Sequence, residues 1–536
     1  MIGSGEGGPA AGGLPYPLPM LNSSSLPYSS KPSYLRLRIR TTNFRPTLLL
    51  VRIRDFEWRS WLYFSAAIFI ITSWFSLGYN QSDEHFQILE FAGLKLNINT
   101  ELDLAWEYKA RMRPTLQPSM VVLLHSFLDV FGIENPFFIS FLLRLLSAGF
   151  SIWICWLLYN TYKHRFSAGQ QQWAFFLFSF FLWFGFYNGV RFNSEMWSAN
   201  TFALAVVLFV RWQKPSAWQY LQLGLLVGLS FLFRYQVAFM IAGMGLWLIF
   251  IQREHWGRLV SFTVGGLLMV LIGVVIDRWF YGEWVFSTWH YFEQNILLDK
   301  ASTFGVDPWW QYFYEIIIKG IPPFGLFYLA ALFFYIWQRP KDLISWLSIP
   351  FIGIHLLIAH KELRFFYVLL PFLPIALSSL LQFWQDHRGT ELTSNKGYRI
   401  GWKIFWVHNA LLTIFIMFWP VIMETKIYQA IYYNYEEPIT VYGVQDNPYR
   451  LALYINYYKR KNVCTAEVDS LDKLPMYGKD PYIIAVDRRY GYDIDGLPGK
   501  KRLIYSTFPD WIHAINFNNW LGRSQWWLVY EVEPRE

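Results

Sequence analysis

The sequence has few of the residues and motifs on which several classes of enzyme depend. It contains only two cysteines, Cys155 inside an apolar run and Cys464 in the polar C-terminal part, so we expect neither a disulfide nor a thiolate metal site. It has no Walker loop, no Rossmann glycine motif and no internal repeat, which argues against direct use of ATP or a nucleotide sugar. Because no His/Cys cluster has zinc spacing and the acidic residues are dispersed, the sequence predicts no obligatory metal and no cofactor.

Charge is also scarce. Charged residues make up 16% of the 536-residue chain, against 54% hydrophobic and 21% aromatic residues. This composition is typical of a multi-pass membrane protein with aromatic belts at the lipid–water interfaces. The net charge of +8 does not indicate nucleic-acid binding, because the basic residues fall in short loops rather than in one continuous stripe. We therefore expect membrane lipids, and no nucleic acid, among the partners.

Long apolar runs predict the membrane topology. A span needs about 20 apolar residues, and about eleven such runs are present. They lie near residues 60–79, 137–161, 171–189, 195–212, 216–232, 236–252, 259–279, 323–338, 343–359, 364–384 and 402–423. With the arginine-rich N-terminus inside, every loop on that side is basic, as the positive-inside rule requires. The same alternation sends the segments that mix acids and bases to the opposite, non-cytoplasmic face.

These runs divide the chain into three predicted regions. Residues 1–58 form a disordered basic cytoplasmic leader, rich in Gly, Pro, Ser and Arg. Residues 59–424 form a transmembrane module with outer loops at 80–136 and 280–322. Residues 425–536 form a small α/β domain on the non-cytoplasmic side. Its expected strands and its helix-like stretch are Ile439–Val444, Tyr482–Val486, Leu503–Thr507 and Trp526–Val532, and Tyr449–Lys461.

The first outer loop opens with two adjacent carboxylates and an imidazole, Asp83, Glu84 and His85. Such acids are often only part of a solvated loop. Here the apolar residues between Phe86 and Lys95 predict an amphipathic helix in the membrane interface. The acids lie at the N-terminus of this helix, where negative charge interacts favourably with the helix dipole. A carboxylate at this position can take a proton from a hydroxyl nucleophile while the spans hold a lipid-linked substrate. The apolar segment 118–133 is expected to lie in or dip into the same interface.

A second part of this loop combines aromatic residues with charge: Trp106, Glu107, Tyr108, Arg111 and Arg113. One interpretation of this segment is a polar loop that aromatic residues anchor in the interface. The positive-inside rule, however, disfavours basic residues on the outer face, so a polyanionic ligand such as a phosphate is a reasonable partner for them.

The junction of two predicted spans carries a third polar cluster: His360, Lys361, Glu362 and Arg364. The basic residues there either snorkel from a helix end or seat a lipid phosphate and its leaving group. The long outer loop 280–322 is rich in aromatic residues, among them Trp309. These aromatic residues either form a surface that binds sugar or isoprenoid or anchor the loop in the membrane interface, and the sequence favours neither interpretation.

In this order the segments resemble the glycosyltransferase family 22 mannosyltransferases, those of N-glycan precursor assembly and the third one of GPI-anchor assembly. The resemblance covers about residues 80–365. Besides the segments above it rests on Arg191 to Glu195, Asp277 with Tyr281-Gly282, Phe304-Gly305 with Pro308-Trp309, and the specific pattern His360-Lys361-Glu362-x-Arg364-Phe365. The chain departs from the family at Ser82, where relatives often carry Pro, and at Tyr235, where Pro is expected after Arg234.

The resemblance implies an α-helical polytopic GT-C fold and a polyprenyl (dolichyl-type) phosphate mannose donor. We expect an inverting transfer in which Asp83 takes the proton of the acceptor hydroxyl and Glu84 positions Asp83 or the acceptor. The donor phosphate is expected at His360, Lys361, Arg364 and Arg234. The remaining residues expected to bind substrate are His85, Trp106, Glu107, Tyr108, Arg111, Arg113, Arg191, Asn193, Glu195, Asp277, Tyr281, Trp309 and Glu362.

The acceptor and the compartment stay open at this point. A lipid-linked glycan or a GPI-like acceptor fits, at the periplasmic face of a bacterial inner membrane or the luminal face of the endoplasmic reticulum. One competing interpretation is a lipid or glycolipid transporter, which would predict internal repeats and charges near the bilayer midplane. Another is a transferase for a different polyprenyl-phosphate sugar, such as glucose or an aminopentose.

Overall fold

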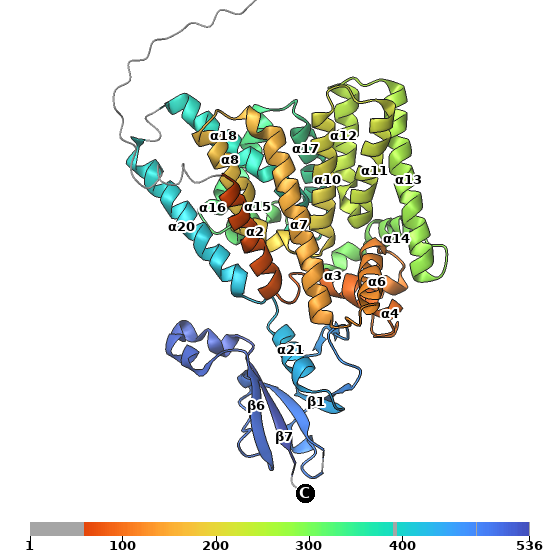
Figure 1. The fold of residues 1–536 in the computed structure, drawn as a ribbon, viewed down its shortest axis with the longest axis vertical. Helices are drawn as coiled ribbons and strands as arrows, with labels where there is room; N and C mark the ends of the chain where they lie inside the picture. The colour runs from red at the N-terminus through yellow and green to blue at the C-terminus, as the bar shows by residue number, and fades with distance from the viewer. Residues whose placement is uncertain (1–57, 390–393, 479, 535–536) are drawn as a thin grey trace, which may run out of the picture. The chain divides into compact units, whose positions relative to one another are not determined.

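A computed structural model describes residues 58–389, 394–478 and 480–534 (Figure 1). The leader predicted at 1–58 lies outside the described residues, apart from Trp58, where the first helix begins. From Trp58 onward the chain forms one compact unit. In that unit a long series of helices is followed by a five-stranded sheet.

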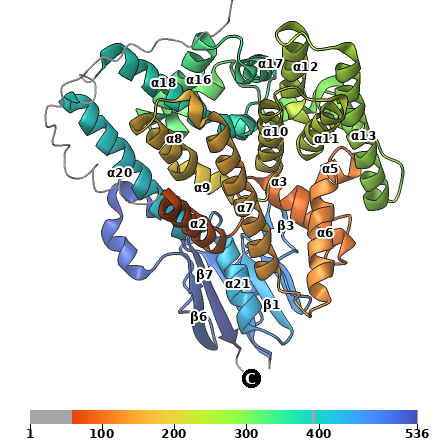
Figure 2. The ribbon, with the colours of Figure 1, turned by 45° about the horizontal axis from the view of Figure 1, so that its top comes forward.

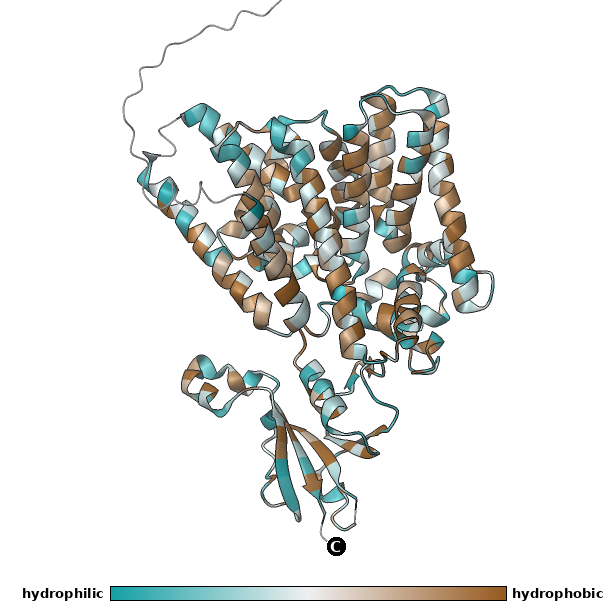
Figure 3. Cartoon of the chain, viewed as in Figure 1, coloured by the Kyte–Doolittle hydropathy of each residue, from teal (hydrophilic) through white to brown (hydrophobic). Residues whose placement is uncertain are grey.

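The predicted apolar runs coincide with helices. These helices are α2 (Trp58–Phe75), α7 (Pro136–Tyr162), α8 (Gln170–Phe181) with α9 (Trp183–Gly189), α10 (Ser194–Arg211), α11 (Ala217–Phe233), α12 (Ala238–Phe250), α13 (Trp256–Tyr281), α16 (Phe324–Gln338), α17 (Leu343–Leu357), η6 (Leu363–Phe372) with α18 (Leu373–Arg388), and α20 (Lys396–Phe418). By length and composition alone, four stretches among the described residues can cross a membrane, and four apolar helices are shorter. Figure 3 shows the apolar residues concentrated along the helices.

The break between α8 and α9 shows how an interrupted apolar helix satisfies its backbone. Leu182 has an extended conformation (φ −73°, ψ 129°), which frees backbone groups on both sides. The Asn409 side chain of α20 accepts a hydrogen bond from the Trp183 N–H (2.9 Å) and donates one to the Phe181 carbonyl. A neighbouring helix thus supplies the hydrogen-bond partners that the break leaves free, one of the ways in which an interrupted apolar helix is tolerated.

The outer loops are built from short helices. These are α3 (Ser82–Glu84), the π-helix η1 (His85–Leu89), α4 (Glu90–Lys95), α5 (Trp106–Lys109) and α6 (Leu116–Asp129) in the first loop, and α14 (Ser287–Phe292), the π-helix η4 (Glu293–Leu297), the 3-10 helix η5 (Lys300–Phe304) and α15 (Gln311–Lys319) in the other. The segment between Phe86 and Lys95 is helical, as predicted, but the expectation that this helix lies in the membrane interface is wrong. Residues 85–93 are all buried, because protein rather than lipid covers them.

The C-terminal part is an α/β sheet domain. Helix α21 (Glu424–Asn434) precedes β1 (Ile439–Val444), β4 (Val463–Val468), β5 (Tyr482–Asp487), β6 (Lys500–Ser506) and β7 (Trp527–Glu533). The strand order is β4-β1-β5-β7-β6, with β1 parallel to β4 and β5, and β7 antiparallel to β5 and β6. The apolar side of α21 packs on the sheet through Ile427 and Ile431 (Figure 2).

The helix expected at Tyr449–Lys461 is absent. That segment instead contains the short hairpin of β2 (Arg450–Leu451) and β3 (Leu453–Tyr454), followed by turns. Ala452 has a φ of 66°, which a helix does not allow, and Tyr449, Tyr457 and Tyr458 are buried. Tertiary burial of these tyrosines therefore overrides the helical pattern.

The sheet domain holds the first outer loop through one carboxylate. Glu90 in α4 is buried, and its Oε1 accepts hydrogen bonds from the backbone N–H groups of Asn456 (2.8 Å) and Tyr457 (3.0 Å). Its other oxygen, Oε2, accepts one from Asn99 Nδ2 (2.7 Å). Asp83 lies only seven residues before Glu90, so the sheet domain helps to fix the segment that carries Asp83.

Candidate active site

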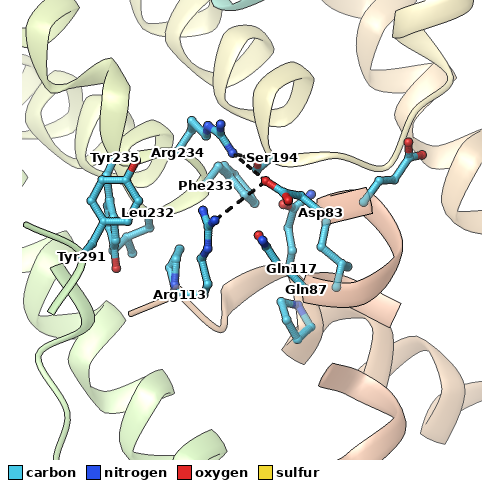
Figure 4. Close-up of a pocket in the computed structure, with 14 residues that line it drawn as sticks. Asp83, Gln87, Arg113, Gln117, Ser194, Leu232, Phe233, Arg234, Tyr235 and Tyr291 are labelled. Atoms are coloured by element: carbon cyan, nitrogen blue, oxygen red, sulfur yellow. Dashed lines mark hydrogen bonds and ion pairs between the residues drawn. The ribbon is translucent and has the colours of Figure 1, made fainter. Parts of the chain in front are cut away.

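A pocket with an empty volume of about 530 Å³ opens beside Asp83 (Figure 4). Its walls come from the first outer loop, the start of α10, the end of α11 and α14. The residues that line it are Asp83, Glu84, Gln87, Ile88, Arg113, Pro114, Gln117, Pro118, Ser194, Leu232, Phe233, Arg234, Tyr235 and Tyr291. Several of these residues were expected from sequence, and the fold brings them together from distant segments.

Three guanidinium groups converge on the Asp83 carboxylate. Its Oδ2 lies 2.7 Å from Arg364 Nη1, 3.8 Å from Arg234 Nη1 and 3.9 Å from Arg113 Nη2. Figure 4 shows Arg113 and Arg234 directed at Asp83. The Asp83 side chain is 16% exposed, so it is partly desolvated but still reachable from the pocket.

These neighbours control the protonation of Asp83. Burial opposes its ionisation, but the positive charges of Arg364, Arg113 and Arg234 more than offset that effect and lower the pKa of Asp83 to about 2. The carboxylate is therefore ionised at neutral pH. It is also a weak base for as long as the arginines surround it.

The same arginines are shared with other acids. Glu195 Oε1 lies 3.3 Å from Arg234 Nη1 and 3.8 Å from Arg364 Nη1. Glu107 Oε1 lies 3.5 Å from Arg113 Nη2 and accepts a hydrogen bond from Gln87 Nε2 (3.1 Å). The cluster is a network of alternating positive and negative side chains. An anionic ligand that enters the pocket must therefore compete with a carboxylate for each arginine.

Glu84 faces a different set of partners. It accepts a hydrogen bond from the Asn80 N–H (2.9 Å), and its Oε1 lies 3.8 Å from Arg191 Nη1. Burial raises the pKa of Glu84, although Arg191 works against this effect. Arg191 is fully buried and also donates to the carbonyls of Gly78 (3.0 Å) and Ser76 (3.2 Å). The pair thus ties the loop to the end of α2.

The cluster at the junction of η6 is mostly engaged with its own loop. Lys361 Nζ donates to the carbonyls of Asp307 (3.1 Å), Ile358 (2.5 Å) and Ala359 (3.5 Å), and burial lowers its pKa. His360 Nε2 lies 3.1 Å from Glu362 Oε1, while Glu362 Oε2 lies 2.7 Å from Arg364 Nε. Of the four residues, Arg364 is the one that contacts Asp83, and Lys361 instead fixes the loop around Asp307.

The sequence comparison identifies the family. The model of the Alg9-like mannosyltransferase family matches residues 60–466. The chain belongs to this family.

Similar proteins agree with this assignment. The chain is 26% identical to GPI alpha-1,2-mannosyltransferase 3 of Xenopus laevis over 300 residues, which is 54% of each chain. It is 26% identical to mannosyltransferase APTG1 of Arabidopsis thaliana over 306 residues, 56% of this chain and 54% of the other. The chain thus spans about half the length of the curated relatives it matches.

The fold agrees with the expected GT-C class. The crystal structure of ArnT from Cupriavidus metallidurans bound to undecaprenyl phosphate superposes with a TM-score of 0.54 over 89% of this chain and 98% of the other. Sequence identity is 13%, so this likeness concerns the fold alone.

Two further residues of the family pattern, Asp277 and Tyr281, support the Arg113 segment. Asp277 Oδ1 accepts hydrogen bonds from the N–H (2.9 Å) and hydroxyl (2.6 Å) of Thr115, and its Oδ2 accepts one from Ser287. The Tyr281 hydroxyl donates to the Arg113 carbonyl (2.8 Å). These contacts hold the loop that carries Arg113 against the end of α13.

Arg111 and Asn193 also make contacts within the protein. The Arg111 guanidinium lies over the rings of Tyr108 and Tyr281, and its Nε donates to Glu283 (2.9 Å). Asn193 caps α10 by accepting a hydrogen bond from the Met196 N–H (2.9 Å). In these positions they shape the surroundings of the pocket rather than its lining.

Three expected substrate-binding residues, His85, Trp106 and Trp309, are not among the residues that line the pocket. His85 is buried with its Nε2 2.9 Å from Glu90, between the rings of Tyr79 and Tyr458. Its imidazole therefore takes part in the contact with the sheet domain. Trp106 is stacked with Phe304, and Trp309 is 61% exposed.

The pocket also contains polar residues outside the expected set of site residues: Gln87, Gln117, Ser194 and Tyr291. Ser194 lies within the Arg191 to Glu195 segment and Tyr291 within the aromatic loop 280–322, both noted in the sequence, whereas Gln87 and Gln117 lie in or beside apolar segments. The Nε2 of Gln117 is buried without a hydrogen-bond partner among the described residues. Within the same residues, no group of three or more His, Cys, Asp or Glu side chains has the arrangement of a metal site.

Proposed function

We propose that the chain is an inverting membrane mannosyltransferase. It moves mannose from a polyprenyl (dolichyl-type) phosphate mannose to a hydroxyl of a lipid-linked glycan or GPI-like acceptor. The observation that carries the proposal is the ionised Asp83 at the mouth of a pocket, surrounded by three arginines, in a chain of the Alg9-like mannosyltransferase family.

In the proposed reaction the acceptor oxygen attacks the anomeric carbon of the mannose. The bond from that carbon to the phosphate oxygen breaks, and its electron pair leaves with the polyprenyl phosphate. The acceptor proton passes to Asp83, and a β-linked donor gives an α-mannoside. Glu84 acts indirectly, since it anchors the loop through Asn80 and Arg191.

The arginines have two successive partners in this scheme. In the free protein they neutralise Asp83, Glu195 and Glu107. The donor is a phosphodiester with one negative charge, and it competes with these carboxylates for Arg364 and Arg234, with His360 at the edge of the cluster. The charge on the phosphate grows as its bond to the sugar breaks, and the arginines then hold it more strongly. Withdrawal of a guanidinium raises the basicity of Asp83, so the base becomes effective when the donor is in place.

The location of the reaction is part of the proposal. The loops that carry the charged network lie at one end of the apolar helices, and the positive-inside rule assigns that end to the luminal or periplasmic face. The similarity to GPI mannosyltransferases from several eukaryotes favours a GPI-like acceptor.

The test is a transfer assay with purified protein in detergent. Short-chain polyprenyl-phosphate mannose is supplied with a panel of mannosylated lipid and oligosaccharide acceptors, and Asp83→Asn is the matched inactive variant. Transfer of mannose that is lost in Asp83→Asn supports the proposal and identifies the acceptor. If the protein instead transfers glucose or an aminopentose from the corresponding donor, or moves the glycolipid across a bilayer without transfer, the mannosyltransferase proposal is wrong.

A further inference from the structure

The pocket contains a buried polar group beside Asp83 that the proposed chemistry does not use (Figure 4). Gln117 is the second residue of α6 and is 4% exposed. Its Nε2 has no hydrogen-bond partner among the described residues, although it lines the same pocket as Asp83 (Figure 4). Buried side-chain amides are normally paired, so an unpaired donor at a pocket wall calls for an explanation.

Two other neutral polar residues of the pocket, Gln87 and Ser194, are already engaged. Gln87 Nε2 donates to Glu107, and Ser194 accepts a hydrogen bond from Arg234 Nη1 (3.2 Å). The arginines are paired with carboxylates. Gln117 differs from Gln87 and Ser194 in that its carboxamide donor is unpaired, and the group has both a donor and an acceptor for a molecule that enters the pocket.

The rest of the pocket lining includes apolar and aromatic residues. Pro114, Pro118, Phe233 and Tyr291 line the pocket together with Gln117. A phosphate prefers the arginines, because it needs cationic donors. A pyranose suits a neutral carboxamide, because its hydroxyls pair with the carboxamide while its C–H face packs on aromatic and proline surfaces.

We propose that Gln117 binds a hydroxyl of the acceptor sugar and so presents a neighbouring hydroxyl to Asp83. This inference rests on the proposed function, since it assigns the acceptor side of the same site.

The first experiment measures binding without turnover. The Asp83→Asn protein in detergent is titrated with a short mannose-terminated glycolipid, with and without Gln117→Met, which keeps the length of the side chain and removes its hydrogen bonds. Leu123→Met, on the exposed face of the same helix, is the control for changes in α6. We expect Gln117→Met to weaken glycolipid binding about tenfold or more, and Leu123→Met to leave it unchanged.

The second experiment measures transfer with acceptors that each lack one hydroxyl. Gln117→Met should raise the KM for the acceptor and leave both the KM for the donor and the hydrolysis of the donor by water unchanged. For one deoxy acceptor the loss caused by Gln117→Met should disappear, since the hydrogen bond is already absent. An equal rise in the donor KM, or equal losses with every deoxy acceptor, would overturn the assignment.

The two experiments separate this inference from the proposed function. If the wild-type protein transfers no mannose but its Asp83→Asn form binds the glycolipid through Gln117, the proposed reaction fails and the acceptor subsite stands. If transfer occurs and glycolipid binding is the same in Gln117→Met, the reaction stands and the subsite is wrong. Thermal unfolding of each variant shows whether a loss of binding is caused only by loss of the fold. In that case Gln117→Glu, which keeps the side-chain oxygens that accept hydrogen bonds, provides the second comparison.

Discussion

Asp83 and Arg364 form a close ion pair in the candidate site, with 2.7 Å between Oδ2 and Nη1. The two residues come from the first outer loop and from the start of η6, nearly 300 positions apart in the sequence. The positive charge of Arg364 keeps Asp83 ionised and at the same time makes it a weaker base. This relationship links the stability of the site to its proposed chemistry.

The first prediction concerns pH. The pKa of Asp83 in the folded protein, about 2, is below its ordinary value of 3.8. The ion pairs therefore contribute stability that is present above the ordinary pKa and is lost as pH falls from about 5 towards 2. The shift corresponds to about 2 kcal/mol. Thermal unfolding in detergent should show Asp83→Asn below the wild type at pH 7, with the gap closing towards pH 2; a gap independent of pH would contradict the assignment.

The second prediction concerns Lys361. Because its ammonium group donates to three carbonyls, Lys361→Met should lower the unfolding temperature and the rate of transfer while leaving the KM for the donor within about twofold. Lys361→Arg should not restore the wild type, since a planar guanidinium cannot replace a compact ammonium among converging carbonyls. Kinetics with varied donor concentration provide the measurement. A large rise in donor KM without loss of stability would instead place the phosphate on Lys361.

Glu90 provides the third prediction. Its buried carboxylate joins the first outer loop to the sheet domain through the N–H groups of Asn456 and Tyr457. Hydrogen bonds to a charged group contribute about 1.5–3 kcal/mol each. Glu90→Gln should therefore increase hydrogen exchange in residues 449–461 and slow transfer. The control is Glu283→Gln, whose partly exposed ion pair with Arg111 should contribute about 0–1 kcal/mol.

Much of the fold could be predicted from local patterns. Apolar runs mark helices because length and composition suffice, and short runs bounded by turn signals mark β1, β5 and β7. The errors come from long-range burial. Residues 86–95 have the pattern of an interfacial helix, but the pattern does not say whether protein or lipid covers the apolar face. The segment 449–461 similarly has the pattern of a helix but does not form one, because its tyrosines pack into the protein.

Only the charged residues of the candidate site could be predicted from the sequence. Asp83, Arg113, Arg234 and Arg364 are conspicuous on the outer face, yet their convergence depends on tertiary structure. Lys361 resembles a phosphate ligand in the sequence, whereas in the structure it binds backbone carbonyls. Gln117 gave no signal, since a neutral residue beside an apolar segment is recognised only when its surroundings are known.

The last prediction tests the packing of α11 against α13, which brings two backbones close together. A Cβ atom on Gly224 would lie 2.0 Å from the Phe262 carbonyl oxygen, and one on Gly265 would lie 2.2 Å from that of Leu221. Because neither backbone can yield without separating the helices, Gly224→Ala and Gly265→Ala should each cost about 1–3 kcal/mol. Gly245→Ala in α12, whose Cβ meets open space, should be neutral or slightly stabilising because alanine favours a helix. Thermal unfolding in one detergent compares the three variants, and equal midpoints would show that α11 and α13 do not pack this closely.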